Sequence, residues 1–151
     1  MIGRAIISSF CTHNLIDDDF VTKNGLKKIN CYPVTYMFKG RIFQSSEKVI
    51  IYVKRKKKIY KAITCYVLYS LNVVTPAIDF DFAFISSVMR PTRLADPDPQ
   101  IARDVDIILG VNETAEFRNG PMETYNNGLI TYKTPFGRVV SGRIPAEFLN
   151  T

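Results

Sequence analysis

The stretch GRAIISSFCTHNLI, residues 3–16, runs from an apolar segment into two serines and a phenylalanine. Residues 3–9 predict a strand that is buried on both faces. A second apolar segment, DIILG at residues 106–110, predicts another buried strand that ends at a glycine. A small residue at such a position lets the loop of a neighbouring strand pass close to the backbone. Two strand ends of this kind are typical of folds in which one strand-loop unit crosses beneath another.

The segments that follow are also rich in strand signals. Residues 29–38 alternate loosely in polarity, and Pro33 favours an edge strand or a bulge there. The polar residues 39–48 predict a turn or a mobile loop. Residues 49–53 and 59–69 are two β-rich runs around a basic cluster, which predicts a long hairpin with a charged turn.

One short helix is indicated between the first two predicted strands. Asp17 or Asp18 can cap its first turn, and Phe20 and Val21 would face inward. Gly25 is placed to end it.

The second half of the chain is broken repeatedly by proline. Residues 75–103 carry four prolines, and only residues 80–89 can form a short helix or strand there. Two further strands are predicted at residues 128–133 and 137–144. Without an internal repeat or a clean linker, we expect a single domain over residues 1–151.

Composition and charge restrict the class of protein. The chain has 151 residues, of which 46% are hydrophobic and 23% charged, so a folded globular protein is expected. No run of 18 apolar residues exists and the start lacks a signal-peptide pattern, so we expect no membrane contact and an intracellular, cytoplasmic or nuclear location. The net charge is +6, which is compatible with an anionic partner.

The sulfur and imidazole side chains do not form a motif. Cys11, Cys31 and Cys65 are odd in number and lack metal-ligand spacing, so buried thiols are expected. His13 is the only histidine, which excludes a histidine-based zinc site. A nucleophilic pair with Cys11 would need an orienting third group, and none is evident. No cofactor or metal is expected.

Four segments of the chain resemble, in order and spacing, the aspartic protease of BEL/Pao-type retrotransposons, a branch of the retropepsin-like proteases. The first segment, AIISSFCTHNLI, aligns without a gap with the active-site segment of that family. The tryptophan of the last family motif is replaced here by Arg138. The matching segments are residues 5–16, residues 24–26 (NGL), residues 94–110 with LADPDP and DIILG, and residues 134–142 (TPFGRVVSG).

The resemblance implies a mainly β, retropepsin-like fold, closed like a β-barrel, with one or two short helices. In such proteases each of two chains supplies one aspartate, and the pair shares a proton and activates a water molecule. A hairpin flap closes over the substrate. The candidates for its tip here are Phe38, Lys39 and Gly40.

This chain departs from the family at the catalytic loop. Ser8 stands where the aspartate should be, Ser9 at the position of the hydroxyl residue, and Phe10 where the glycine should be. A serine hydroxyl cannot replace half of a carboxylate pair. The resemblance therefore implies a domesticated, retrotransposon-derived pseudoenzyme with no catalytic residue.

Three functions are compatible with these observations. The first is homodimerisation or contact with a protein partner through a surface formed by Ser8, Ser9, Phe10, Ile108, Leu109 and Gly110. The second is nucleic-acid binding through the basic cluster Lys54, Arg55, Lys56, Lys57 and Lys58. The third, which we rank last, is residual aspartic endopeptidase activity.

Overall fold

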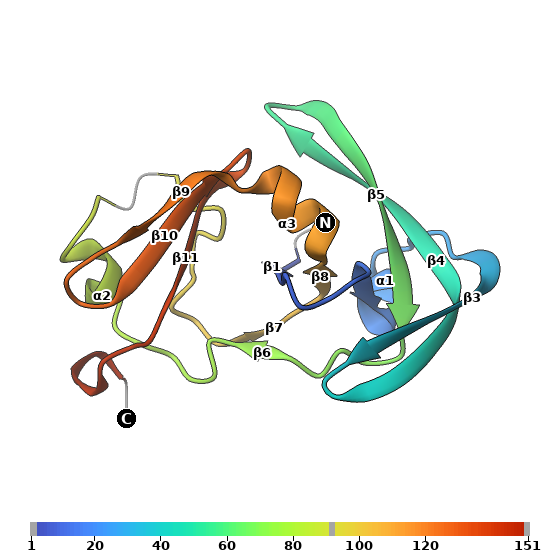
Figure 1. Cartoon of the computed structure of the whole chain (residues 1–151), viewed down its shortest axis with the longest axis horizontal. Helices are drawn as coiled ribbons and strands as arrows, with labels where there is room; N and C mark the ends of the chain where they lie inside the picture. The colour runs from blue at the N-terminus through green and yellow to red at the C-terminus, as the bar shows by residue number, and fades with distance from the viewer. Residues whose placement is uncertain (1–2, 91–92, 150–151) are drawn as a thin grey trace. The chain divides into compact units, whose positions relative to one another are not determined.

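The computed structural model describes residues 3–90 and 93–149, which fold into two compact units (Figure 1). The first unit comprises the chain up to Val73 together with Val105–Glu116, and the second comprises Val74–Asp104 and the chain from Phe117 onward. The prediction of one domain over residues 1–151 stays a prediction.

The first unit is built on a six-stranded sheet, curled like half of a barrel, with the strand order β1-β8-β2-β5-β4-β3. Two short helices accompany this sheet, and the second of them begins directly after Gly110. The elements are β1 (Ala5–Ile7), β2 (Leu15–Asp17), α1 (Asp18–Lys23), β3 (Ile29–Phe38), β4 (Arg41–Arg55), β5 (Lys58–Leu68), β8 (Ile107–Leu109) and α3 (Val111–Phe117).

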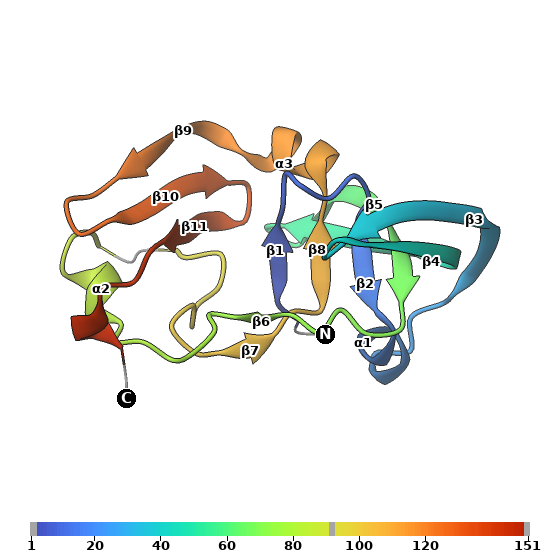
Figure 2. The same ribbon diagram turned by 60° about the horizontal axis from the view of Figure 1, so that its bottom comes forward.

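Strand β8 lies between β1 and β2 in this sheet (Figure 2). β1 and β2 are consecutive in the chain and are joined by a short loop. β1 pairs with β8 in parallel, from Ala5 opposite Ile107 to Ile7 opposite Leu109. β2 pairs with β8 in the antiparallel sense. β8 is buried throughout, whereas β1 is an edge strand with Ala5 exposed. The expectation that residues 3–9 are buried on both faces was wrong, because Ala5 and Ser9 are exposed and Ile6 and Ile7 are only half-buried.

Helix α1 confirms the prediction made for residues 17–28. The Asp17 carboxylate caps the helix by accepting a hydrogen bond from the Asp19 N–H at 2.9 Å. Phe20 and Val21 are buried, and Gly25 after the helix has a φ of 61°. A residue without a side chain adopts this left-handed conformation at no steric cost, which explains the end of the helix there.

Strands β3 and β4 form a hairpin around Lys39 and Gly40. β3 is the other edge of the sheet, and its pairing is irregular between Asn30 and Val34, as Pro33 predicted. The prediction of a loop over residues 39–48 was wrong, because β4 begins at Arg41.

Strands β4 and β5 form the long hairpin that the basic segment predicted. Its turn consists of Lys56 and Lys57, with φ values of 50° and 66°. Two-residue hairpin turns need such left-handed backbone, which is why Asn-Gly is common at these positions. Lysine is strained there, because its Cβ crowds the following carbonyl group.

The second unit holds a three-stranded sheet with the order β11-β10-β9, a two-stranded ribbon and two short helical segments. Its apolar cluster is centred on Phe80, Phe84, Ile85 and Leu129. The predicted hairpin of residues 128–144 is confirmed. The elements are β6 (Val74–Thr75), α2 (Ala83–Ser86), β7 (Arg103–Asp104), β9 (Asn119–Thr124), β10 (Leu129–Thr134), β11 (Gly137–Gly142) and the 3-10 helix η1 (Ala146–Phe148).

The predicted class, mainly β with few helices, is confirmed. The described residues contain three short α-helices and one 3-10 helix, more than the one or two expected. Within residues 3–90 and 93–149, no helix combines the length and the apolar character that crossing a bilayer requires.

The strained turn yields a stability prediction. We expect the double substitution K56N/K57G to stabilise the protein by about 1 kcal/mol, because it supplies the residues that left-handed backbone favours. Urea denaturation of both proteins measures the difference. The control, K54N/R55G, removes the same charge from extended backbone in β4 and should lower stability, since glycine weakens a strand. Equal effects of the two variants would contradict the explanation.

Candidate functional site

The loop between β1 and β2 is held by backbone hydrogen bonds to β8 and α3. The Ser8 N–H donates to the Leu109 carbonyl at 2.8 Å, and the Val111 N–H donates to the Cys11 carbonyl at 2.8 Å. The Cys11 N–H closes a turn by donating to the Ser8 carbonyl. The loop is therefore fixed at both of its ends.

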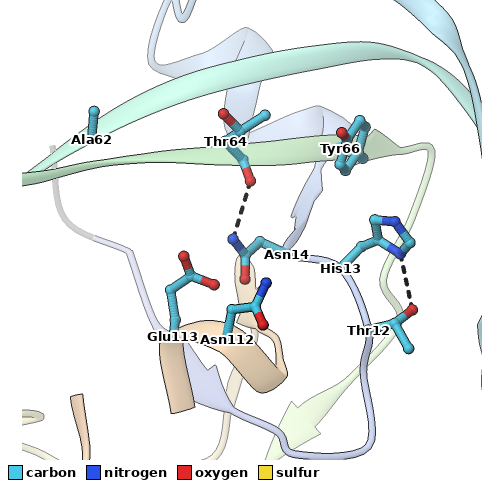
Figure 3. Close-up of a pocket in the computed structure, with 8 residues that line it drawn as sticks. All are labelled: Thr12, His13, Asn14, Ala62, Thr64, Tyr66, Asn112 and Glu113. Carbon is cyan, nitrogen blue, oxygen red and sulfur yellow. Dashed lines mark hydrogen bonds between the residues drawn. The ribbon is translucent and has the colours of Figure 1, made fainter. Parts of the chain in front are cut away.

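Asn14 joins three parts of the first unit from a buried position (Figure 3). Its Oδ1 accepts a hydrogen bond from the Gly110 N–H at 2.7 Å, and its Nδ2 donates to the Thr64 carbonyl at 3.1 Å. The side chain thereby links the β1–β2 loop to the end of β8 and to β5. Sequence reasoning did not single out Asn14, because an isolated asparagine after a loop carries no recognisable pattern.

Gly110 lies directly beneath this loop. A Cβ atom at Gly110 would lie 2.8 Å from the Cys11 carbonyl oxygen and 2.9 Å from that of His13. These contacts are too short for any side chain, and both neighbours are backbone atoms. The predicted close passage of a loop over this glycine is confirmed.

The loop presents Phe10 to solvent. The Phe10 side chain is 94% exposed, Ser9 is also exposed, and Ser8 is half-buried. Beneath them Ile108, Leu109 and Gly110 are buried. Of the six positions expected to form a contact surface, Ser9 and Phe10 are thus the accessible ones, and the three on β8 support the loop from below.

Aromatic side chains from the β3–β4 hairpin pack over the inner side of the same loop. Tyr36 and Phe38 are buried in one cluster with Cys11 and Leu15. The ring of Phe43 stacks on that of Tyr36, with centroids 6.1 Å apart. The space between the hairpin and the loop is therefore occupied by the protein's own side chains.

The predicted flap tip is held to the body of the first unit. Phe38 is buried, whereas Lys39 and Gly40 are exposed at the turn. The Lys39 ammonium group donates to the Asn72 carbonyl and lies over the Phe38 ring at 5.7 Å from its centroid. These contacts hold the turn against a neighbouring segment.

A polar cavity of about 320 Å³ lies beside the loop. The His13 ring contacts Tyr36 and Tyr66, and its Nδ1 is 2.9 Å from the Thr12 hydroxyl. Glu113 accepts from the Lys61 ammonium group at 3.5 Å. Figure 3 shows the lining residues, which are Thr12, His13, Asn14, Ala62, Thr64, Tyr66, Asn112 and Glu113.

The three thiols are unpaired and differ in burial. All three cysteines are free, and Cys11 and Cys65 are buried as expected, while Cys31 is half-buried. Burial raises the pKa of the Cys65 thiol to about 12, and the charge of Glu113 adds to the effect. The hydrogen bond that His13 makes is with Thr12. Among the described residues, no three His, Cys, Asp or Glu side chains are grouped so that they could hold a metal ion.

Acidic residues that follow the loop in sequence, and Asp106 directly before β8, have structural partners. Asp17 caps α1 and also accepts from the Leu71 N–H at 3.0 Å. Asp18 pairs with Lys28 at 2.5 Å. Asp106 accepts from the Arg4 N–H at 2.8 Å. Each of these three carboxylates thus makes a contact within the first unit.

The basic cluster is exposed at the free end of the β4–β5 hairpin (Figure 1). Lys61 lies further along β5 and pairs with Glu113 and Glu116 of α3. The residues of the cluster are Lys54, Arg55, Lys56, Lys57 and Lys58.

Comparisons of the chain with models of protein families, with curated proteins and with solved structures found no match.

Gly110 provides a direct test of that geometry. We expect Gly110→Ala to lower the free energy of unfolding by about 3 kcal/mol, because two backbone carbonyls would have to move. Chemical denaturation measures the loss. The control is Gly40→Ala, where φ is positive but nothing lies within 4 Å of the added methyl group. A loss at Gly110 no larger than that at Gly40 would refute the packing argument.

Proposed function

We propose that the chain is a retropepsin-like, retrotransposon-derived domain without peptidase activity, which functions as a homodimerisation or protein-interaction module. The surface that makes the contact is the β1–β2 loop with Phe10 at its tip. A second copy of the chain is the partner that we favour.

The pairing of the resembling segments supports a retropepsin-like fold. Residues 5–16 and 106–110 meet as the neighbouring strands β1 and β8. Residues 94–99 and 134–142 also meet, because the Ala95 N–H donates to the Arg138 carbonyl at 2.8 Å. Segments far apart in sequence are thus adjacent in pairs, which is expected if they belong to one inherited architecture.

Two observations support the loss of peptidase activity. The loop carries Ser8 and Ser9 and no carboxylate, so no group there can act as half of an acid pair. In addition, Tyr36 and Phe38 pack against Cys11 at the back of the loop. These buried rings leave less room for an extended peptide on the inner side of the loop.

The exposure of Phe10 carries the proposal of a contact function. A phenylalanine buries on the order of 150–250 Å² when it is covered, so leaving it in water is unfavourable. At 94% exposure it gains almost nothing within its own chain. The loop beneath it is fixed by hydrogen bonds to Leu109 and Val111, so little conformational entropy is lost when a partner covers it. Rigid aromatic side chains of this kind are frequent hot spots of protein interfaces.

Self-association tests this proposal. We expect the protein to form a dimer and Phe10→Ser to raise the dissociation constant roughly thirtyfold, the effect of losing about 2 kcal/mol at a hot spot. Sedimentation equilibrium over a range of protein concentrations measures the constant.

Tyr32→Ser is the matched control, because Tyr32 is also 94% exposed but lies on the edge strand β3. It should leave the dissociation constant unchanged. A wild-type protein that stays monomeric at high micromolar concentration, or dimerisation that depends on Tyr32 rather than Phe10, would disprove the proposed contact.

Peptidase activity is expected to be absent. A panel of peptides between about pH 4 and pH 7, the range in which paired aspartates work, should give no pepstatin-sensitive cleavage. Ser8→Ala serves as the control for contaminating proteases. Cleavage by the unmodified chain that disappears in Ser8→Ala would show that the domain is an enzyme.

A further inference from the structure

The free end of the β4–β5 hairpin carries a cluster of positive charges, and no ion pair among the described residues neutralises them. Its five consecutive cations are all exposed, and within residues 3–90 and 93–149 none of them forms an ion pair. Lys61 shows the contrast, because it is bound to Glu113 and Glu116. The mutual repulsion of five cations is unfavourable for the isolated protein and is relieved when a polyanion binds. The cations are Lys54, Arg55, Lys56, Lys57 and Lys58.

The turn at this end carries lysines at two positions where the backbone conformation favours other residues. Lys56 and Lys57 both have left-handed backbone, at φ values of 50° and 66°, where asparagine and glycine are the favourable residues. Local conflicts between sequence and backbone of this kind are concentrated at functional sites. A turn needed only for its shape would not require lysine at either position.

Aromatic side chains lie behind the cations on the same hairpin. Tyr52 is 60% exposed and Tyr60 40% exposed. Tyr52 pairs across the strands with Ala62, whose small side chain leaves one face of the Tyr52 ring uncovered by its partner. Exposed rings beside a basic segment are the elements with which proteins bind unpaired bases, since bases stack on the rings and phosphates pair with the cations.

We propose that the end of the β4–β5 hairpin is a binding site for single-stranded nucleic acid. Phosphates bind to the five cations, and a base stacks on Tyr52, the more exposed of the two rings. A lipid surface fits less well, because the outermost residues are all cationic and the apolar side chains lie behind them. A duplex fits less well, because the hairpin end offers stacking rings that paired bases cannot use. The site does not involve Phe10, so it stands independently of the proposed dimer.

The experiment measures binding of a fluorescent oligo(dT) of about twenty nucleotides to the full chain by anisotropy, from about 50 to 200 mM salt. We expect K56N/K57G to bind at least about tenfold more weakly at the lowest salt concentration. A plot of the logarithm of the binding constant against the logarithm of the salt concentration should have a slope that is smaller in magnitude by about 1.4. This is the value for two lost phosphate contacts on a single strand. Because this substitution suits the turn, a loss of binding cannot be attributed to unfolding.

Two matched variants complete the design. K23Q/K27Q removes the same charge from exposed lysines near α1 and should change the affinity by less than about twofold, because no phosphate reaches them. Tyr52→Ser should weaken binding about fivefold or more without changing the salt dependence, since stacking involves no counterion. Tyr32→Ser, a change at an equally exposed ring on β3, should have no effect.

Several results would overturn the proposal. These are no binding of the oligonucleotide at low salt, equal losses in K56N/K57G and K23Q/K27Q, or an unchanged affinity in Tyr52→Ser. Binding of a duplex of the same length as tightly as the single strand would also reject it. A protein that binds phosphatidylserine vesicles but not the oligonucleotide would overturn the proposal as well.

Discussion

The first unit depends on one close contact, the passage of the Cys11 and His13 carbonyls over Gly110. Only a residue without a side chain allows the loop to lie this near to the end of β8. The approach places the Gly110 nitrogen 2.7 Å from the Asn14 Oδ1, which accepts its hydrogen bond. The Nδ2 of the same amide donates to the Thr64 carbonyl of β5. It also lets β8 insert between β1 and β2 and lets α3 start directly afterwards. A larger residue would separate all of these elements at once.

The same contact explains why the loop presents an aromatic side chain so fully. With its backbone bonded to Leu109 and Val111, the loop cannot fold back to bury Phe10. The interior beneath it is already filled by the rings of Tyr36 and Phe38. Within the described residues the Phe10 ring therefore stays in water, and this exposure is the observation from which the proposed contact is argued.

Much of this arrangement could be predicted from local patterns, and the failures have identifiable causes. The cap of α1 and the charged hairpin follow from short-range signals such as Asp17, Gly25 and the β-rich runs beside the lysines. The start of β4 was missed because its residues are polar. Ser45 is nonetheless buried there, with its hydroxyl oxygen 2.9 Å from the Glu47 and Val67 carbonyl oxygens, which share its one proton, a contact that sequence cannot reveal.

Helix α3 was missed for a similar reason. Its seven residues show no apolar period, and long-range partners stabilise it, since Glu113 pairs with Lys61. The position of Gly110 beneath a loop was predictable, because its cause is steric and local to the glycine. The filling of the interior by Tyr36 and Phe38 was not, because it depends on how the β3–β4 hairpin bends over the sheet.

The way the chain leaves and re-enters the first unit has a consequence for how that unit tolerates changes elsewhere. The Val105 N–H donates to the Val73 carbonyl at 2.8 Å, so the chain returns to the first unit beside the point where it left. Residues 74–104 begin and end in the paired strands β6 and β7, which form a stem. Because this stem pairs with itself, a change of loop length beyond it need not displace β8.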